Sequence, residues 1–198
     1  TGGTVAAVDV AGTTAYVTRF STALASYTLT VVDVADPAVP TVVGQVAIPG
    51  FSPAIAHLGT TVYIAGGTAG VFVVDAAVPS APVFVRALEV GSYDRGVAVD
   101  ASSTPARLAV ASGDYTVGEG TVTRFSLANP LAPVRSGQYV SPFVIEDIAW
   151  GAGGFVSLYA SASYIGVIGL NANLQQATSS MAPPANLVFG SNRLALAP

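Results

Sequence analysis

The stretch Thr28–Pro40, TLTVVDVADPAVP, decides the fold because the chain repeats it. It returns as VFVVDAAVPSAP at Val71–Pro82 and less closely as RFSLANPLAP at Arg124–Pro133, whereas GVIGLNAN at Gly166–Asn173 has the strand without the prolines. Each copy begins with β-branched and apolar residues, which favour a strand, and most copies end in Asp or Asn followed by prolines, which favour a turn. The chain is therefore predicted to be a repeat protein built from β-strands.

The segments between these copies repeat as well. The residues at Ala7–Val17 match those at Ile55–Ala65, with Gly12 aligned to Gly59. Similar sequences begin at Gly96, Asp147 and Leu187. Each unit of about 40 to 50 residues holds four short strands and shows no helical periodicity, which is typical of a β-propeller blade. The predicted fold class is all-β, a propeller of four-stranded antiparallel blades whose apolar faces cover one another.

The repeat divides the chain (1–198), taken as a single partial propeller, into blades at about 4–49, 52–91, 95–140 and 145–184, with an incomplete fifth at 185–198. A propeller closes with four to eight blades, so we expect a fragment of a larger propeller. A closed four-bladed ring is the alternative, although it leaves the last strands without a place. Open blade edges would be apolar, and we expect further copies or the rest of the propeller to cover them.

The composition excludes several classes of function. Only 9% of the residues are charged, against about 25% in an average soluble protein, and the net charge of −4 provides no basic surface for nucleic acid. The chain contains neither lysine nor cysteine, which rules out a Walker-type phosphate loop, Schiff-base chemistry, disulfides, thiolate metal sites and cysteine nucleophiles. No apolar run is long enough for a membrane-spanning helix.

The segments TLTVVDVADPAVPTVVGQV and GVFVVDAAVPSAPVFVRALEVGSYDRGVAV resemble the LVIVD-repeat family of bacterial surface and secreted propellers. The resemblance is strongest in the first two blades, fair in the third and weak in the fourth, where Asn171 and Asn173 replace the prolines. It implies a propeller fold and an extracytoplasmic location, either secreted, periplasmic or at the cell surface. It implies no reaction, because a fold does not dictate a function.

Catalytic residues are not predicted. His57 is the only histidine, which excludes sites with two histidines, and no Gly-x-Ser-x-Gly elbow accompanies it. We interpret His57 as structural. The repeated Asp and Asn residues before the prolines, at Asp33, Asp36, Asp75 and Asn129, could suggest calcium, but they lack the spacing of a calcium loop and are explained by turn chemistry.

The repeated turn recurs after 42 residues from Pro37 to Pro79 but after 51 from Pro79 to Pro130, an excess of nine residues. We place this excess of blade three in Ala101–Gly120, where a long loop would project from the binding face. The loops between the second and third strands of a blade share a face with the loops that lead to the next blade. This reasoning gathers five acids with Arg95 and Tyr115, and with Tyr93, Tyr164 and Arg19 nearby. The candidate site residues are Asp94, Arg95, Asp114, Tyr115, Glu119, Glu146 and Asp147.

Several interpretations of this acidic loop face remain open. The main one is a non-enzymatic module that acts as a scaffold or binds a protein or glycan partner and needs no cofactor. The second is a calcium site, with Asp94, Asp114 and Glu119 as ligands, or a hydrolytic site that uses paired carboxylates. The third is a structural subunit of a surface assembly joined through open blade edges. The general preference of charged residues for solvent-exposed loops would also place these acids on one face without any binding site.

Overall fold

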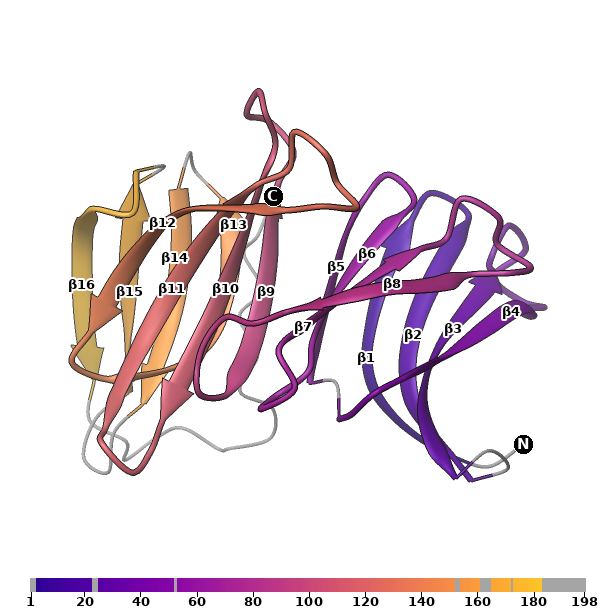
Figure 1. Cartoon of the computed structure of the whole chain (residues 1–198), viewed down its shortest axis with the longest axis horizontal. Coiled ribbons are helices and arrows are strands. Elements are labelled where there is room, and N and C mark those ends of the chain that lie inside the picture. Colours follow the sequence, from indigo (N-terminus) through magenta and orange to yellow (C-terminus); the bar gives the residue numbers. More distant parts are fainter. Residues whose placement is uncertain are drawn as a thin grey trace. The chain divides into compact units, whose positions relative to one another are not determined.

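Sixteen strands, paired into four separate four-stranded antiparallel sheets, make up the part of the chain that the structure describes (Figure 1). The structure is a computed structural model, and it describes residues 3–22, 25–51, 53–151, 154–160, 165–171 and 173–182. Two compact units, Thr1–Glu89 and Val90–Pro198, each contain two of the sheets. The predicted four-stranded antiparallel blades are confirmed.

The first unit contains blades one and two. In each blade the strands pair in sequence order, so a hairpin turn or another short connection joins every two neighbouring strands. Blade one consists of β1 (Gly3–Ala11), β2 (Thr14–Ser21), β3 (Ser26–Asp33) and β4 (Thr41–Ile48), and blade two consists of β5 (Ala54–Leu58), β6 (Thr61–Ala65), β7 (Val71–Asp75) and β8 (Val83–Leu88).

The second unit contains blades three and four, which have the same strand order. Blade three consists of β9 (Asp94–Asp100), β10 (Arg107–Asp114), β11 (Glu119–Ser126) and β12 (Val134–Ser141), and blade four consists of β13 (Val144–Gly151), β14 (Gly154–Ala160), β15 (Ile165–Asn171) and β16 (Gln176–Ala182).

Within each unit, one face of the first blade packs on the opposite face of the second. We call the face of blade one that carries Ala7, Tyr16, Leu29 and Val31 its front face, and the other its back face. The front face of blade one shares a buried core with the back face of blade two, which carries Ile55, Val62, Ile64, Phe72 and Val74. In unit two, Ala98, Ala109 and Val122 on the front face of blade three share a core with Ile148, Phe155 and Ile168 on the back face of blade four. Alternation of side chains along each strand produces these two faces.

The repeated turns form as turn chemistry requires. The backbone N–H groups of Ala35 and Ala77 donate to Asp33 Oδ1 and Asp75 Oδ1, both at 2.9 Å, and the N–H of Leu131 donates to Asn129 Oδ1 at 3.1 Å. A side-chain oxygen that accepts from the N–H two residues on starts a turn without any ligand. The turn hydrogen bonds predicted for these residues are therefore confirmed.

The nine extra residues of blade three divide between two places. The β9–β10 connection has six residues where the β5–β6 connection has two, and the β10–β11 hairpin spans 20 residues where the β6–β7 hairpin spans 15. The connection lies at the opposite end of β10 from the tip of the hairpin, so only the longer hairpin extends the candidate face. The incomplete fifth blade predicted at 185–198 lies outside the described residues, as does Tyr164.

Among the described residues, none belongs to a helix that is long and apolar enough to cross a membrane.

Candidate functional site

The inner strands of blades three and four each contain a β-bulge. In β9, Asp94 pairs with Ser112 and Gly96 with Ala111, which leaves Arg95 as the extra residue. In β13 the register skips Glu146 in the same way. A bulge interrupts the alternation of side chains and redirects one of them. Arg95 and Glu146 therefore occupy the same repeat position in neighbouring blades.

These two bulge residues meet. Arg95 Nη1 donates to Glu146 Oε2 at 3.4 Å, and their side chains are only 18% and 6% exposed. The Arg95 guanidinium also lies over two aromatic rings, 4.7 Å from the centroid of Tyr93 and 4.5 Å from that of Tyr115. The hydroxyl of Tyr115 donates to Glu146 Oε1. We call these four residues the Arg95 cluster; charge, stacking and hydrogen bonding all hold it together.

Tyr115 reaches the cluster from the tip of the β10–β11 hairpin. Asp114 Oδ1 shapes the tip by accepting from the N–H of Thr116 at 2.8 Å and from its hydroxyl at 2.6 Å. These hydrogen bonds, the side-chain one first, lower the pKa of Asp114. Gly118 then takes a φ of +74°, a conformation that favours glycine. The tip therefore has a defined shape and presents Tyr115 in a fixed position.

The tip nevertheless remains open to solvent. Tyr115 is 61% exposed and its neighbour Val117 is 66% exposed. Burial of part of the ring, followed by the hydrogen bond to Glu146, raises the pKa of the Tyr115 phenol. The hairpin presents an aromatic ring that is anchored on one side and accessible on the other.

Asp94 does not belong to this exposed surface. Its side chain is fully buried on the back face of blade three, where Oδ1 accepts from Ser112 Oγ at 2.6 Å. Burial raises the pKa of Asp94 to about 6, although hydrogen bonds from Ser112 and from the backbone of Gly91 act in the opposite direction. Its Oδ2 is buried and has no hydrogen-bond partner among the described residues.

Asp147 is also buried, at the contact between blades three and four. Its Oδ1 accepts from the backbone N–H of Ile148 at 2.9 Å. A Cβ added to Gly96 would lie 2.9 Å from the same oxygen, so the two inner strands approach closely at this point. Asp147 therefore serves blade packing, whereas the adjacent Glu146 serves the Arg95 cluster.

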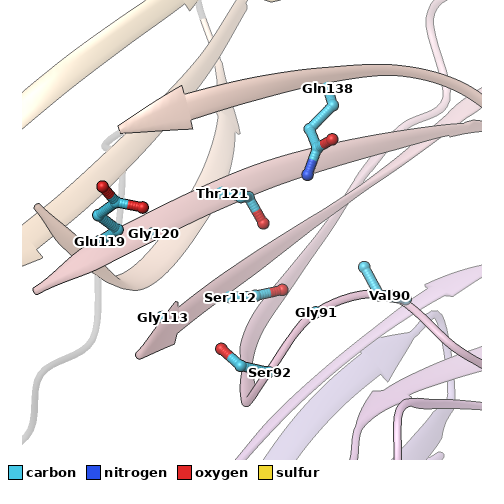
Figure 2. A pocket seen from close by; sticks show the side chains of 9 residues that line it. All are labelled: Val90, Gly91, Ser92, Ser112, Gly113, Glu119, Gly120, Thr121 and Gln138. Carbon is cyan, nitrogen blue, oxygen red and sulfur yellow. The ribbon is translucent and has the colours of Figure 1, made fainter. Parts of the chain in front are cut away.

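Glu119 lies at the rim of a small polar pocket on blade three. The pocket holds about 100 Å³, and its lining residues are Val90, Gly91, Ser92, Ser112, Gly113, Glu119, Gly120, Thr121 and Gln138. Figure 2 shows the hydroxyls of Ser92 and Thr121 and the amide of Gln138 directed toward this space. The buried Thr121 Oγ1 has no hydrogen-bond partner among the described residues. A space of this size and polarity has room for a few water molecules.

The structure therefore brings together three of the seven candidate residues, Arg95, Tyr115 and Glu146, and adds Tyr93 to them. The expected exposed acidic face does not hold for Asp94, Glu146 and Asp147, which are all buried. The carboxylates proposed as calcium ligands do not converge either: Asp94 is buried, Asp114 shapes a turn and Glu119 lines the pocket. No group of three metal-ligating side chains occurs within the described ranges.

Comparison with known proteins agrees with this architecture. The LVIVD repeat family matches residues 2–48 and 50–94, which correspond to blades one and two. No curated protein matches the sequence. Among solved structures, the Dos1 propeller superposes with a TM-score of 0.66 at 9% identity, over 91% of this chain and 48% of that one.

Two further structures match to a similar extent. Sqt1 of Saccharomyces cerevisiae gives a TM-score of 0.64 at 10% identity, over 90% of this chain and 48% of its own. A functionally unknown protein from Desulfotomaculum acetoxidans DSM 771 gives 0.64 at 10% identity, over 90% of this chain and 56% of its own. This chain thus spans about half the length of these three solved proteins, and the similarity shows the fold alone. The predicted propeller class is confirmed.

Proposed function

From the premise that this chain is an LVIVD-repeat β-propeller, we propose that it is a non-enzymatic, extracytoplasmic binding module that recognises a protein partner through the tip of the β10–β11 hairpin. The observation that carries the proposal is the exposed Tyr115, which Arg95 and Glu146 hold in place. The extracytoplasmic location rests on the family resemblance.

Two physical arguments favour a binding role for this tip. Tyrosine and arginine are enriched among the residues that dominate binding energy at protein interfaces. A ring that is already fixed by Arg95 and Glu146 loses little conformational freedom when a partner covers it, which favours affinity. Val117, which is 66% exposed on the same tip, adds apolar area beside the ring.

A selection of displayed peptides tests the proposal. Peptides enriched on the wild-type chain are measured against Tyr115→Ala and against Val78→Ala, a control that removes a 57% exposed apolar side chain from a turn of blade two. We expect binding to weaken at least tenfold for Tyr115→Ala and to stay unchanged for Val78→Ala. Peptides that bind both variants equally well would contradict the proposal.

A glycan array probed with the same variants separates the two partner classes. Signals on the array that depend on Tyr115, with no enriched peptide, would replace the protein partner with a glycan. We also propose that the module needs no calcium. Its thermal midpoint is then expected to be the same in calcium chloride and in EDTA, and a midpoint that rises with calcium would favour a calcium-binding function instead.

A further inference from the structure

The back face of blade one is apolar and exposed. Val5, Val8 and Val10 of β1 are 60%, 60% and 53% exposed. They pair with Arg19, Val17 and Ala15 of β2, so all three point to the back face despite the bulge between Val5 and Ala7. A strip of three valines in one inner strand leaves apolar area in water that a folded domain ordinarily covers.

The same repeat positions are buried in blade four. Ile145, Ile148 and Trp150 pair with Tyr159, Ser157 and Phe155 in the register that Val5, Val8 and Val10 have in blade one. Ile145 and Ile148 are 0% and 4% exposed, and Trp150 packs against the same core, whose other side is the front face of blade three. In this repeat, the back face of an inner strand is therefore a surface for contact with another blade.

The only charged residue that pairs with this valine strip is hydrogen-bonded within blade one. Arg19 Nε donates to Thr30 Oγ1 at 3.2 Å, and Nη2 donates weakly to Gln45 Oε1 at 3.5 Å. Both acceptors are uncharged and do not compensate the charge of Arg19, so a partner that covers the valines has to leave the Arg19 guanidinium in contact with water.

The chain also carries the complementary surface. Ala98, Ala109 and Val122 on the front face of blade three are 6%, 0% and 0% exposed beneath blade four. Their equivalents on the front face of blade four are Ala149, Val156 and Val167, by the register of β13, β14 and β15. These three are only partly buried. The chain thus carries an exposed back face on blade one and a partly buried front face on blade four.

We infer that the back face of blade one docks on the front face of blade four of a second copy of this chain. Because the two surfaces differ, the contact is heterologous, and two such contacts close a dimer if the geometry permits. The chain's own surfaces favour this occupant, because the front face of blade four has the register of the front face of blade three, on which the back face of blade four already packs.

Light scattering after size-exclusion chromatography tests the inference on the full 198-residue chain. We expect a particle of twice the 19.8 kDa chain mass, or a longer open assembly at high concentration. Val8→Asp places a charge in the proposed contact and is expected to weaken association about 100-fold or more. Val39→Asp is the matched control, because Val39 is 64% exposed but lies in a turn. A wild-type monomer at every concentration, or association unaffected by Val8→Asp, would overturn the inference.

Mixing two variants tests the heterologous geometry. Val156→Asp disables the front face of blade four, with Ala149→Glu as a substitute if circular dichroism shows that Val156→Asp lowers the thermal midpoint. Val8→Asp and Val156→Asp should each be monomeric alone. In their mixture, the unmutated blade one of the Val156→Asp chain can still dock on the unmutated blade four of the Val8→Asp chain. The mixture is therefore expected to contain particles of twice the chain mass. A mixture that stays monomeric would refute this pairing of faces.

Discussion

His57 Nδ1 lies 2.7 Å from Asp9 Oδ2, and the two residues come from the inner strands of blades two and one. The side chains are 26% and 29% exposed, and the His57 ring also contacts the Tyr16 ring at 5.9 Å between centroids. The only histidine of the chain thus joins two blades at the edge of their shared core. This contact gives His57 a structural role.

A double-mutant cycle measures the contribution of this pair. His57→Gln, Asp9→Asn and the double variant are unfolded in urea, and the coupling free energy follows from the three differences. We expect a coupling of about 0.5–1 kcal/mol, the range for partly exposed ion pairs and hydrogen bonds. Additive effects of the two substitutions would show that the blades are held by apolar packing alone at this point.

Asp94 predicts a pH dependence of stability. Burial raises its pKa from 3.8 to about 6, so the folded state holds the proton more tightly than the unfolded state. The contribution of Asp94 to stability is therefore most favourable below the unfolded pKa, and it declines as the pH rises from about 4 through about 6. The upper limit of this decline is of the order of 2–3 kcal/mol.

Urea denaturation of wild type and Asp94→Asn at several pH values measures this predicted decline of stability with rising pH. The asparagine cannot ionise, so the part of the decline that comes from Asp94 is expected to vanish, whatever the absolute stability of the variant. Val39→Asn, at an exposed turn, is the control; it leaves every carboxyl group in place and should keep the wild-type slope. An Asp94→Asn curve parallel to wild type across this pH window would show that Asp94 does not titrate there.

The sequence predicts best those features whose chemistry is local. Asp33 and Asn129 accept hydrogen bonds from the backbone N–H two residues further on, so a short repeated motif suffices to predict their turns. The contact between Arg95 and Glu146 depends on a β-bulge in each of two strands. Each bulge adds one residue and so interrupts the alternation from which the face of a side chain is predicted. The burial of Asp94 depends on Ser112 in the next strand. Adjacent positions in a sequence do not encode such contacts.

Gly120 lies where β11 passes the start of β13. A Cβ at this position would lie 2.6 Å from both Ile145 N and Phe143 O, which are backbone atoms that cannot move independently. Gly120→Ala is therefore expected to lower the free energy of unfolding by about 1–3 kcal/mol. In Gly50→Ala the added carbon would meet its nearest neighbour at 3.8 Å, so urea denaturation should show a much smaller change. Equal effects of the two substitutions would contradict the close approach of blades three and four.

The Arg95 cluster provides the last prediction. Arg95→Ala leaves the 6% exposed Glu146 carboxylate without its cation and removes the surface on which Tyr93 and Tyr115 stack. An uncompensated buried charge costs about 1–3 kcal/mol, so the variant should unfold at a lower urea concentration. Arg95→Lys keeps the positive charge but lacks the planar group, so its free energy of unfolding should lie between those of wild type and Arg95→Ala.

Glu146→Gln distinguishes lost charge pairing from lost packing. In the Arg95→Ala background it removes the unpaired charge and still offers an oxygen to the Tyr115 hydroxyl, so it should recover part of the lost stability. Arg135→Ala is the matched control, because Arg135 is exposed and donates to Gln138 at 2.7 Å, and it should change stability by less than about 0.5 kcal/mol. If the double variant is no more stable than Arg95→Ala, the cluster is held by stacking on the two tyrosines, and the ion pair with Glu146 contributes little.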